Sequence, residues 1–191
     1  MALVLTSGPA VEPVTVSEAK AHLRIDGTAD DVLIASLILT SRLHIESSLD
    51  LALITQSWTL IRDRWPNSTE VEIPMSPLQS IAAVRVKNAS GAADVVPATS
   101  YLVDIASRPP QLIWNAALKP NPGIRANGIE IDFTAGFGAT AASVPAPLKH
   151  AISMLVAHWF EHRDPIEIGS DGARMPAAVS DLIQPFRKIR L

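Results

Sequence analysis

One short motif near the carboxyl end of the chain has the residue types of a metal site. His158, Glu161 and His162 fit the H-x-x-E-H pattern, in which two imidazoles one helical turn apart can bind Zn²⁺ and the glutamate can act as a general base. A catalytic zinc also needs a third protein ligand, and the acidic candidates that follow are Glu167 and Asp181. A zinc hydrolase therefore stays open as an alternative hypothesis. The preferred interpretation is an ordinary helix end carrying histidines.

A glycine motif, Gly136 to Ala141, fits the G-x-G-x-x-A turn of dinucleotide-binding proteins. Its continuation argues against a cofactor, because Ser143 to Pro147 separate it from the next helix and no helix amino terminus follows the turn. The sequence also lacks the G-x-S-x-G elbow of serine hydrolases. We therefore expect no catalytic residues, no cofactor and no metal, and we interpret the glycines as a turn from sheet to helix.

The composition excludes several classes of protein. The 191 residues contain no cysteine, so a disulfide framework or a thiolate metal site is impossible. A net charge of −3 gives no overall basic field for wrapping nucleic acid, and 5% aromatic residues are too few for a base-stacking surface. The charge is polarised along the chain, because the first fifty residues hold seven acids and three bases whereas residues 186–191 hold three bases and no acid.

Helical signals occur at both ends of the chain. Thr15 and Glu18 form a capping box that predicts a helix ending near Gly27, and Thr28 or Asp30 caps a longer helix that reaches about Leu49. Two further helices are expected after Pro147, ending near 163, and from 176, where Pro185 shortens or kinks the helix. The first residues lack the basic start of a signal peptide, and no apolar run is long enough to span a membrane.

The long helix over 30–49 has two apolar stripes when its residues are placed at 100° intervals. The first stripe is Leu33, Ile34, Leu37, Ile38 and Ile45. The second, on the far side, is Val32, Leu39 and Leu43. Two stripes need two partners, and the second partner is either another subunit or another segment of a helical bundle. We predict that the second stripe faces a neighbouring subunit.

The middle of the chain changes to an alternating pattern broken by proline and glycine. Strands are expected at about 56–64, 70–73, 80–87, 100–104, 111–114 and 128–134. The gaps are too short for crossover helices, so the strands are antiparallel. The predicted fold is α+β, a small helical bundle with an inserted antiparallel sheet or sandwich. Its expected parts are helices at 13–52, the β region at 55–135, helices at 145–187 and a basic, apolar tail at 186–191.

Several segments taken together resemble one protein family, although they contain no catalytic residues. The segments are residues 14–26, 30–34, 53–58, 77–81, 134–138 and 144–161. In this order they are similar to the head-tail connector (neck adaptor) proteins of tailed phages, prophages and gene transfer agents. The resemblance covers residues 13–187.

This resemblance implies a structural role at the head-tail junction of a virion or phage-like particle that is made in the cytoplasm of a bacterial host. The expected assembly is a ring of twelve copies beneath the portal protein, which extends the DNA channel and receives a stopper or tail-completion protein. DNA would pass through without sequence-specific binding, and no membrane is involved. A tail-completion protein of the same neck is an alternative.

The carboxyl-terminal tail is expected to contact the portal. Its apolar anchors would be Phe186, Ile189 and Leu191, and its electrostatic partners Arg187, Lys188 and Arg190.

Overall fold

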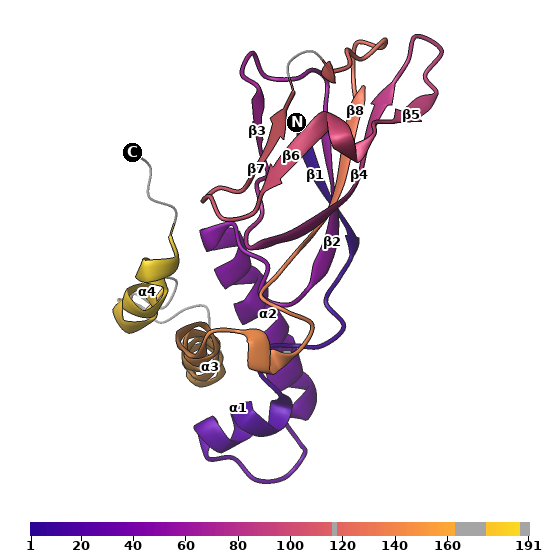
Figure 1. The fold of residues 1–191 in the computed structure, drawn as a ribbon. Coiled ribbons are helices and arrows are strands. Elements are labelled where there is room, and N and C mark those ends of the chain that lie inside the picture. The colour runs from indigo at the N-terminus through magenta and orange to yellow at the C-terminus, as the bar shows by residue number, and fades with distance from the viewer. Residues whose placement is uncertain (116–117, 163–174, 188–191) are drawn as a thin grey trace. The chain divides into compact units, whose positions relative to one another are not determined.

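The structure is a computed structural model that describes residues 1–115, 118–162 and 175–187. The chain divides into two compact units. Met1–Pro9 and Asp50–Phe137 form the first, here called the β unit, and Ala10–Leu49 and Gly138–Leu191 form the second, here called the helical unit. The fold is α+β, as the sequence predicted (Figure 1).

The β unit contains two antiparallel sheets. The five-stranded sheet has the order β1 (Ala2–Ser7), β2 (Gln56–Arg62), β8 (Ile129–Ala135), β4 (Leu78–Lys87) and β5 (Ala93–Val95). The three-stranded sheet has the order β3 (Glu70–Glu72), β7 (Gln111–Trp114) and β6 (Tyr101–Asp104). A short 3₁₀ turn, Ala98–Ser100, leads into β6.

Strict alternation along the central strand β8 defines the core of the β unit. Ile129, Ile131, Phe133 and Ala135 are buried, whereas the residues between them are only half-buried. Leu112 and Trp114 of the second sheet belong to the same hydrophobic cluster, where the Trp114 ring meets the Trp65 ring edge-on at 4.7 Å between centroids. The alternation that the sequence showed therefore corresponds to one apolar core and one polar face.

The helical unit contains α1 (Val16–Leu23), α2 (Asp31–Leu49), α3 (Ala146–Glu161) and α4 (Ala177–Ile183). The predicted capping box is present, since Thr15 Oγ1 accepts from the Glu18 amide and the Glu18 carboxylate accepts from the Thr15 amide. Helix α2 packs on α3, α1 packs on both, and α4 packs on α3 (Figure 1). Two 3₁₀ turns, Ala141–Ser143 and Gln184–Phe186, precede α3 and follow α4, the second beginning next to Pro185 as expected.

Contrary to the expectation that no apolar run is long enough to span a membrane, helix α2 passes that test by length and composition alone. The core helix of a soluble protein passes the same test, and α2 packs one face against the other helices of its unit.

Three details differ from the predictions. Strands β1 and β5 were not expected, because both are short edge strands with little or no alternation. Helix α1 ends at Leu23 rather than near Gly27, since Arg24 takes the left-handed conformation that terminates a helix. Leu33 was expected on the core face of α2, but it is 36% exposed because the buried stripe follows four-residue steps from Ile34.

Gly136 supplies a test of the turn that ends β8. Its φ is +138°, and an added Cβ would lie 2.6 Å from the Ile54 carbonyl carbon. We expect Gly136→Ala to lower the free energy of unfolding by about 2–4 kcal/mol, because backbone strain and a backbone clash act together. Gly8→Ala, where nothing lies within 4 Å, is the matched control for urea unfolding. Equal stability of the two variants would contradict this account.

Candidate subunit interface

The first turn of α2 is held by an ion pair with α1. Lys20 Nζ lies 2.7 Å from Asp31 Oδ1 and also donates to the Gly27 carbonyl. Asp31 lies at the positive end of the α2 dipole, and its carboxylate is paired there with the Lys20 ammonium group. The only acid in the first turn of α2 is thus paired within the helical unit.

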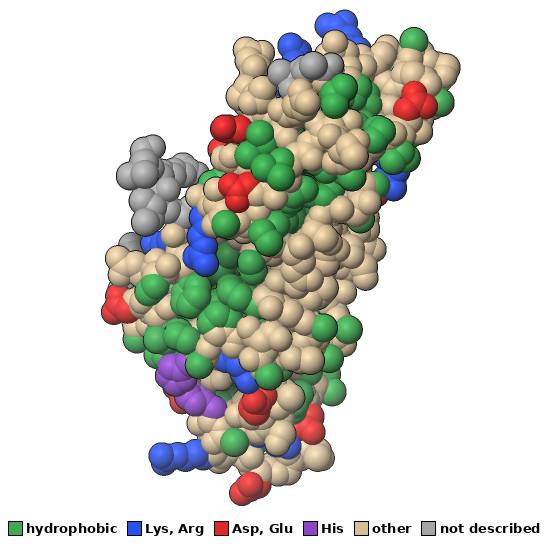
Figure 2. Space-filling model, viewed as in Figure 1, with side chains coloured by type: hydrophobic (Ala, Val, Ile, Leu, Met, Phe, Trp, Pro, Cys, Tyr) green, Lys and Arg blue, Asp and Glu red, His purple; other side chains and the backbone are tan. Residues whose placement is uncertain are grey.

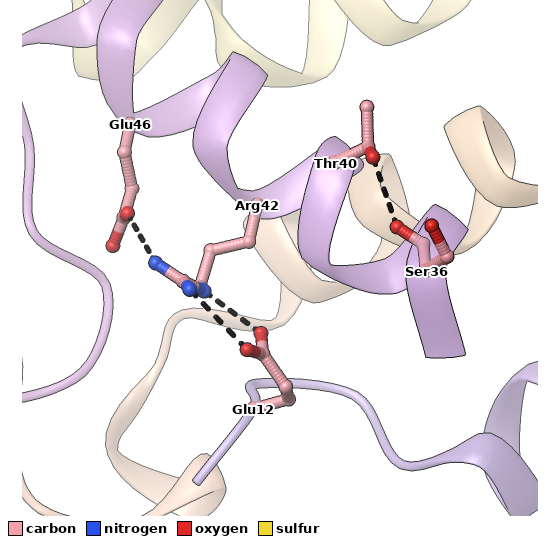
Figure 3. A network of polar contacts seen from close by, with 5 residues as sticks. All are labelled: Glu12, Ser36, Thr40, Arg42 and Glu46. Carbon is pink, nitrogen blue, oxygen red and sulfur yellow. Dashed lines mark hydrogen bonds and ion pairs between the residues drawn. The ribbon is translucent and has the colours of Figure 1, made fainter. Parts of the chain in front are cut away.

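The other two charged residues of α2 form a buried ion cluster with the segment before α1 (Figure 3). Arg42 Nη1 donates to Glu46 Oε2 at 2.7 Å, and Arg42 Nε donates to Glu12 Oε2 at 2.8 Å. A third contact, Nη2 to Glu12 Oε1 at 3.3 Å, makes the Glu12 pairing bidentate. Arg42 is 5% exposed and Glu46 is 6% exposed.

Two opposing effects act on the pKa of Arg42. Burial alone lowers the pKa of the guanidinium, but the hydrogen bonds and charges of Glu12 and Glu46 outweigh it and raise the pKa above its usual value. Arg42 is therefore a permanent cation whose charge is matched inside the unit. This cluster was not predicted from the sequence, although an Arg and a Glu four residues apart within a predicted helix are a visible signal.

The outward face of α2 consequently has no formal charge. All of α2 is described, and its exposed residues are Val32, Leu33, Ala35, Ser36, Leu39, Thr40, Leu43, His44, Ser47 and Ser48. The predicted second stripe lies on this face, with exposed fractions of 86% for Val32, 43% for Leu39 and 50% for Leu43. We call this set the α2 face. The centres of protein interfaces contain few charged residues, whereas a helix face in contact with solvent normally carries several.

The histidines of the H-x-x-E-H motif lie at the end of α3. All five histidines are in the helical unit, and Figure 2 shows histidine side chains gathered at its surface. The His158 and His162 rings are 4.6 Å apart, and His162 Nδ1 lies 2.8 Å from the His158 carbonyl oxygen. Among the described residues no three His, Asp or Glu side chains could hold a metal together. Glu167 lies outside the described residues, and Asp181 is on α4.

The predicted portal-contacting tail is described only in part. Phe186 is half-buried in the last 3₁₀ turn and Arg187 is exposed. Lys188, Ile189, Arg190 and Leu191 lie outside the described residues.

The ion cluster of α2 yields a stability prediction. We expect Arg42→Met to lower the free energy of unfolding by about 3–5 kcal/mol, because it leaves the buried Glu46 without its cation. Arg42→Met/Glu46→Leu replaces both buried charges by apolar groups and should recover most of that loss. Urea unfolding of both variants measures this, and a double variant as unstable as the single one would contradict the predicted pairing.

Comparisons with known proteins agree with the resemblance found in the sequence. Residues 13–92 match the family described as phage gp6-like head-tail connector proteins. No curated protein matches.

Solved structures match the whole fold. A chain in the neck of an empty gene transfer agent particle, with C6 symmetry, has a TM-score of 0.85 and 28% identity, covering 100% of this chain and 97% of that chain. A chain in the virion of a native gene transfer agent gives 0.84 and 28% with the same coverage. A chain in a native neck with C12 symmetry gives 0.77 and 29% over 98% of this chain and 97% of that chain. The predicted resemblance is thereby confirmed: residues 13–92 match a phage gp6-like head-tail connector domain, and the similar neck structures support a structural connector role in a phage-like particle.

Proposed function

We propose that twelve copies of this chain form a closed ring in the neck of a phage-like particle, beneath the portal protein, and that the α2 face is buried between neighbouring copies. The proposal is supported by the α2 face, which holds no Asp, Glu, Lys or Arg and exposes Val32, Leu39 and Leu43. The symmetry of the similar necks, C12 and C6, supports a ring of identical subunits. The role is structural, without catalysis.

A ring built from one kind of subunit needs contacts that join two different surfaces and close after a fixed number of copies. The α2 face suits one side of such a contact. Val32, Leu39 and Leu43 contribute apolar area, and the small polar side chains between them permit close approach of another backbone. Because no ion on this face has to lose its hydration, its burial carries no charge desolvation cost.

The ends of the ring have different partners in this proposal. The tail, residues 186–191, contacts the portal through its apolar and basic side chains, while a stopper or tail-completion protein binds the opposite end. The half-buried position of Phe186 supports a tail that is anchored to the helical unit at its first residue. A tail-completion role, the alternative within the same neck, would instead require binding to the tail and not to the portal.

DNA passes through the ring without being held. The chain has no excess of cations, and paired charges on the polar face of the five-stranded sheet support this property. Arg85 Nη1 lies 2.6 Å from Asp132 Oδ2, and Lys87 Nζ lies 2.7 Å from Glu130 Oε1. Cations that are already neutralised release few counterions on meeting phosphates, so they add little to DNA affinity.

Charged substitutions on the α2 face test the ring contact. We expect Leu43→Glu, and more strongly Leu39→Glu/Leu43→Glu, to abolish ring formation on purified portal particles in negative-stain electron microscopy, because a carboxylate would be desolvated without a partner. Leu118→Glu is the matched control, since Leu118 is also 50% exposed but lies in the β unit. Circular dichroism should be unchanged in all three variants. Normal rings from the double variant would contradict the proposal.

Truncation tests the portal contact. Deleting residues 186–191 should abolish co-sedimentation with portal particles and leave the circular dichroism spectrum intact, because only the expected anchors are removed. Replacing Arg187, Lys188 and Arg190 by Gln separates the two contributions and should weaken binding mainly at low salt. Unchanged binding of the truncated chain would rule out the tail as the portal contact.

A further inference from the structure

The two sheets of the β unit have four edge strands in the part of the chain that the structure describes: β1, β5, β3 and β6. An edge strand presents unpaired N–H and C=O groups that another strand can use, so natural proteins usually protect edges by shortness, charge or proline. The four edges differ sharply in this protection.

Strand β1 is the least protected edge. It has six residues, Ala2–Ser7, with no charged side chain and no proline. Val4 and Leu5 are 44% and 46% exposed, while β1 pairs on its other side with β2. The bulge between Leu5 and Ser7 leaves a regular ladder from Ala2 to Leu5. An apolar, uncharged edge of this kind is an aggregation hazard unless another strand covers it.

Two of the remaining edges are protected. Strand β3 has three residues, and its exposed side chains are the acids Glu70 and Glu72. Strand β5 also has three residues and carries Asp94 at its centre, although its last residue, Val95, is 66% exposed.

Strand β6 is the second open edge. Its four residues include Leu102, which is 66% exposed, and Ile105 follows the strand at 58%. The acid at its end, Asp104, is turned into the next loop, where its carboxylate accepts from the amides of Ala106 and Ser107 and from the Ser107 hydroxyl. The strand therefore presents an exposed apolar side chain, Leu102, on an edge whose one acid is held in the following loop.

We infer that β1 of one subunit pairs with β6 of the next subunit, so that the sheets join around the ring. The inference rests on the proposed ring. A β1 to β1 contact would be self-complementary and would stop at a dimer, whereas a β1 to β6 contact joins two different surfaces and can propagate until the ring closes. Strand addition at a free edge supplies main-chain hydrogen bonds, and the exposed Val4 and Leu102 side chains supply apolar contact.

Engineered disulfides test this pairing, and the absence of natural cysteine gives a clean background. We expect Val4→Cys/Leu102→Cys to give a ladder of linked species on a non-reducing gel after mild oxidation of portal-bound rings, since paired strands bring Cβ atoms within disulfide range. Val4→Cys/Val95→Cys, which places the second thiol on the β5 edge, should give no ladder. Val4→Lys should reduce the yield of rings at least tenfold without altering circular dichroism.

Four results would overturn the inference. Dimers from Val4→Cys alone would indicate a β1 to β1 contact, and a ladder from the β5 pair would indicate the wrong edge. If Val4→Cys/Leu102→Cys forms intact rings in the microscope but gives no ladder, the strand pairing is wrong and the proposed ring is unaffected. Failure of the unmodified chain to form rings would overturn both proposals.

Discussion

The buried pairing of Arg42 with Glu12 and Glu46 is the interaction on which the surface of the helical unit depends. A guanidinium inside a protein is tolerated only with acidic partners, so the cluster fixes both the rotation of α2 and the path of the segment before α1. Since the charged side chains of α2 are paired within their own unit, the outward face holds apolar residues, small polar residues and His44. The same packing that stabilises the subunit thus produces a surface suited to another subunit.

The β unit also pairs its charged side chains internally, but its exposed apolar residues lie on strand edges. Its polar sheet face carries cations that are matched by acids on neighbouring strands, so it offers little to a polyanion. Its edges, by contrast, are unequal: β3 and β5 have three residues each with an acid pointing outward or at the centre, whereas β1 is longer and has no charge and β6 exposes Leu102. Both units combine internally satisfied charge with localised apolar surface, which is the pattern expected of an assembly component.

Much of the fold could be predicted from the sequence because its signals are local. The Thr15–Glu18 capping box, the prolines before α3 and the alternation of β8 each depend on neighbouring residues only. The α2 stripe of Val32, Leu39 and Leu43 was also predictable from helical periodicity, and its exposure agrees with that reading. Strand β1 was not, because an edge strand is defined by its partner β2, some fifty residues away. Likewise, Glu12 joins Arg42 only through the tertiary fold, so the cluster gave no pattern beyond one i, i+4 pair.

The central claim is that the uncharged α2 face is an interface between copies of this chain. Cryo-electron microscopy of the protein bound to purified portal rings tests it most directly. We expect a closed ring of twelve subunits in which Val32, Leu39 and Leu43 are buried against the adjacent subunit. A ring in which these three side chains remain in contact with solvent, or are covered by their own subunit, would contradict it.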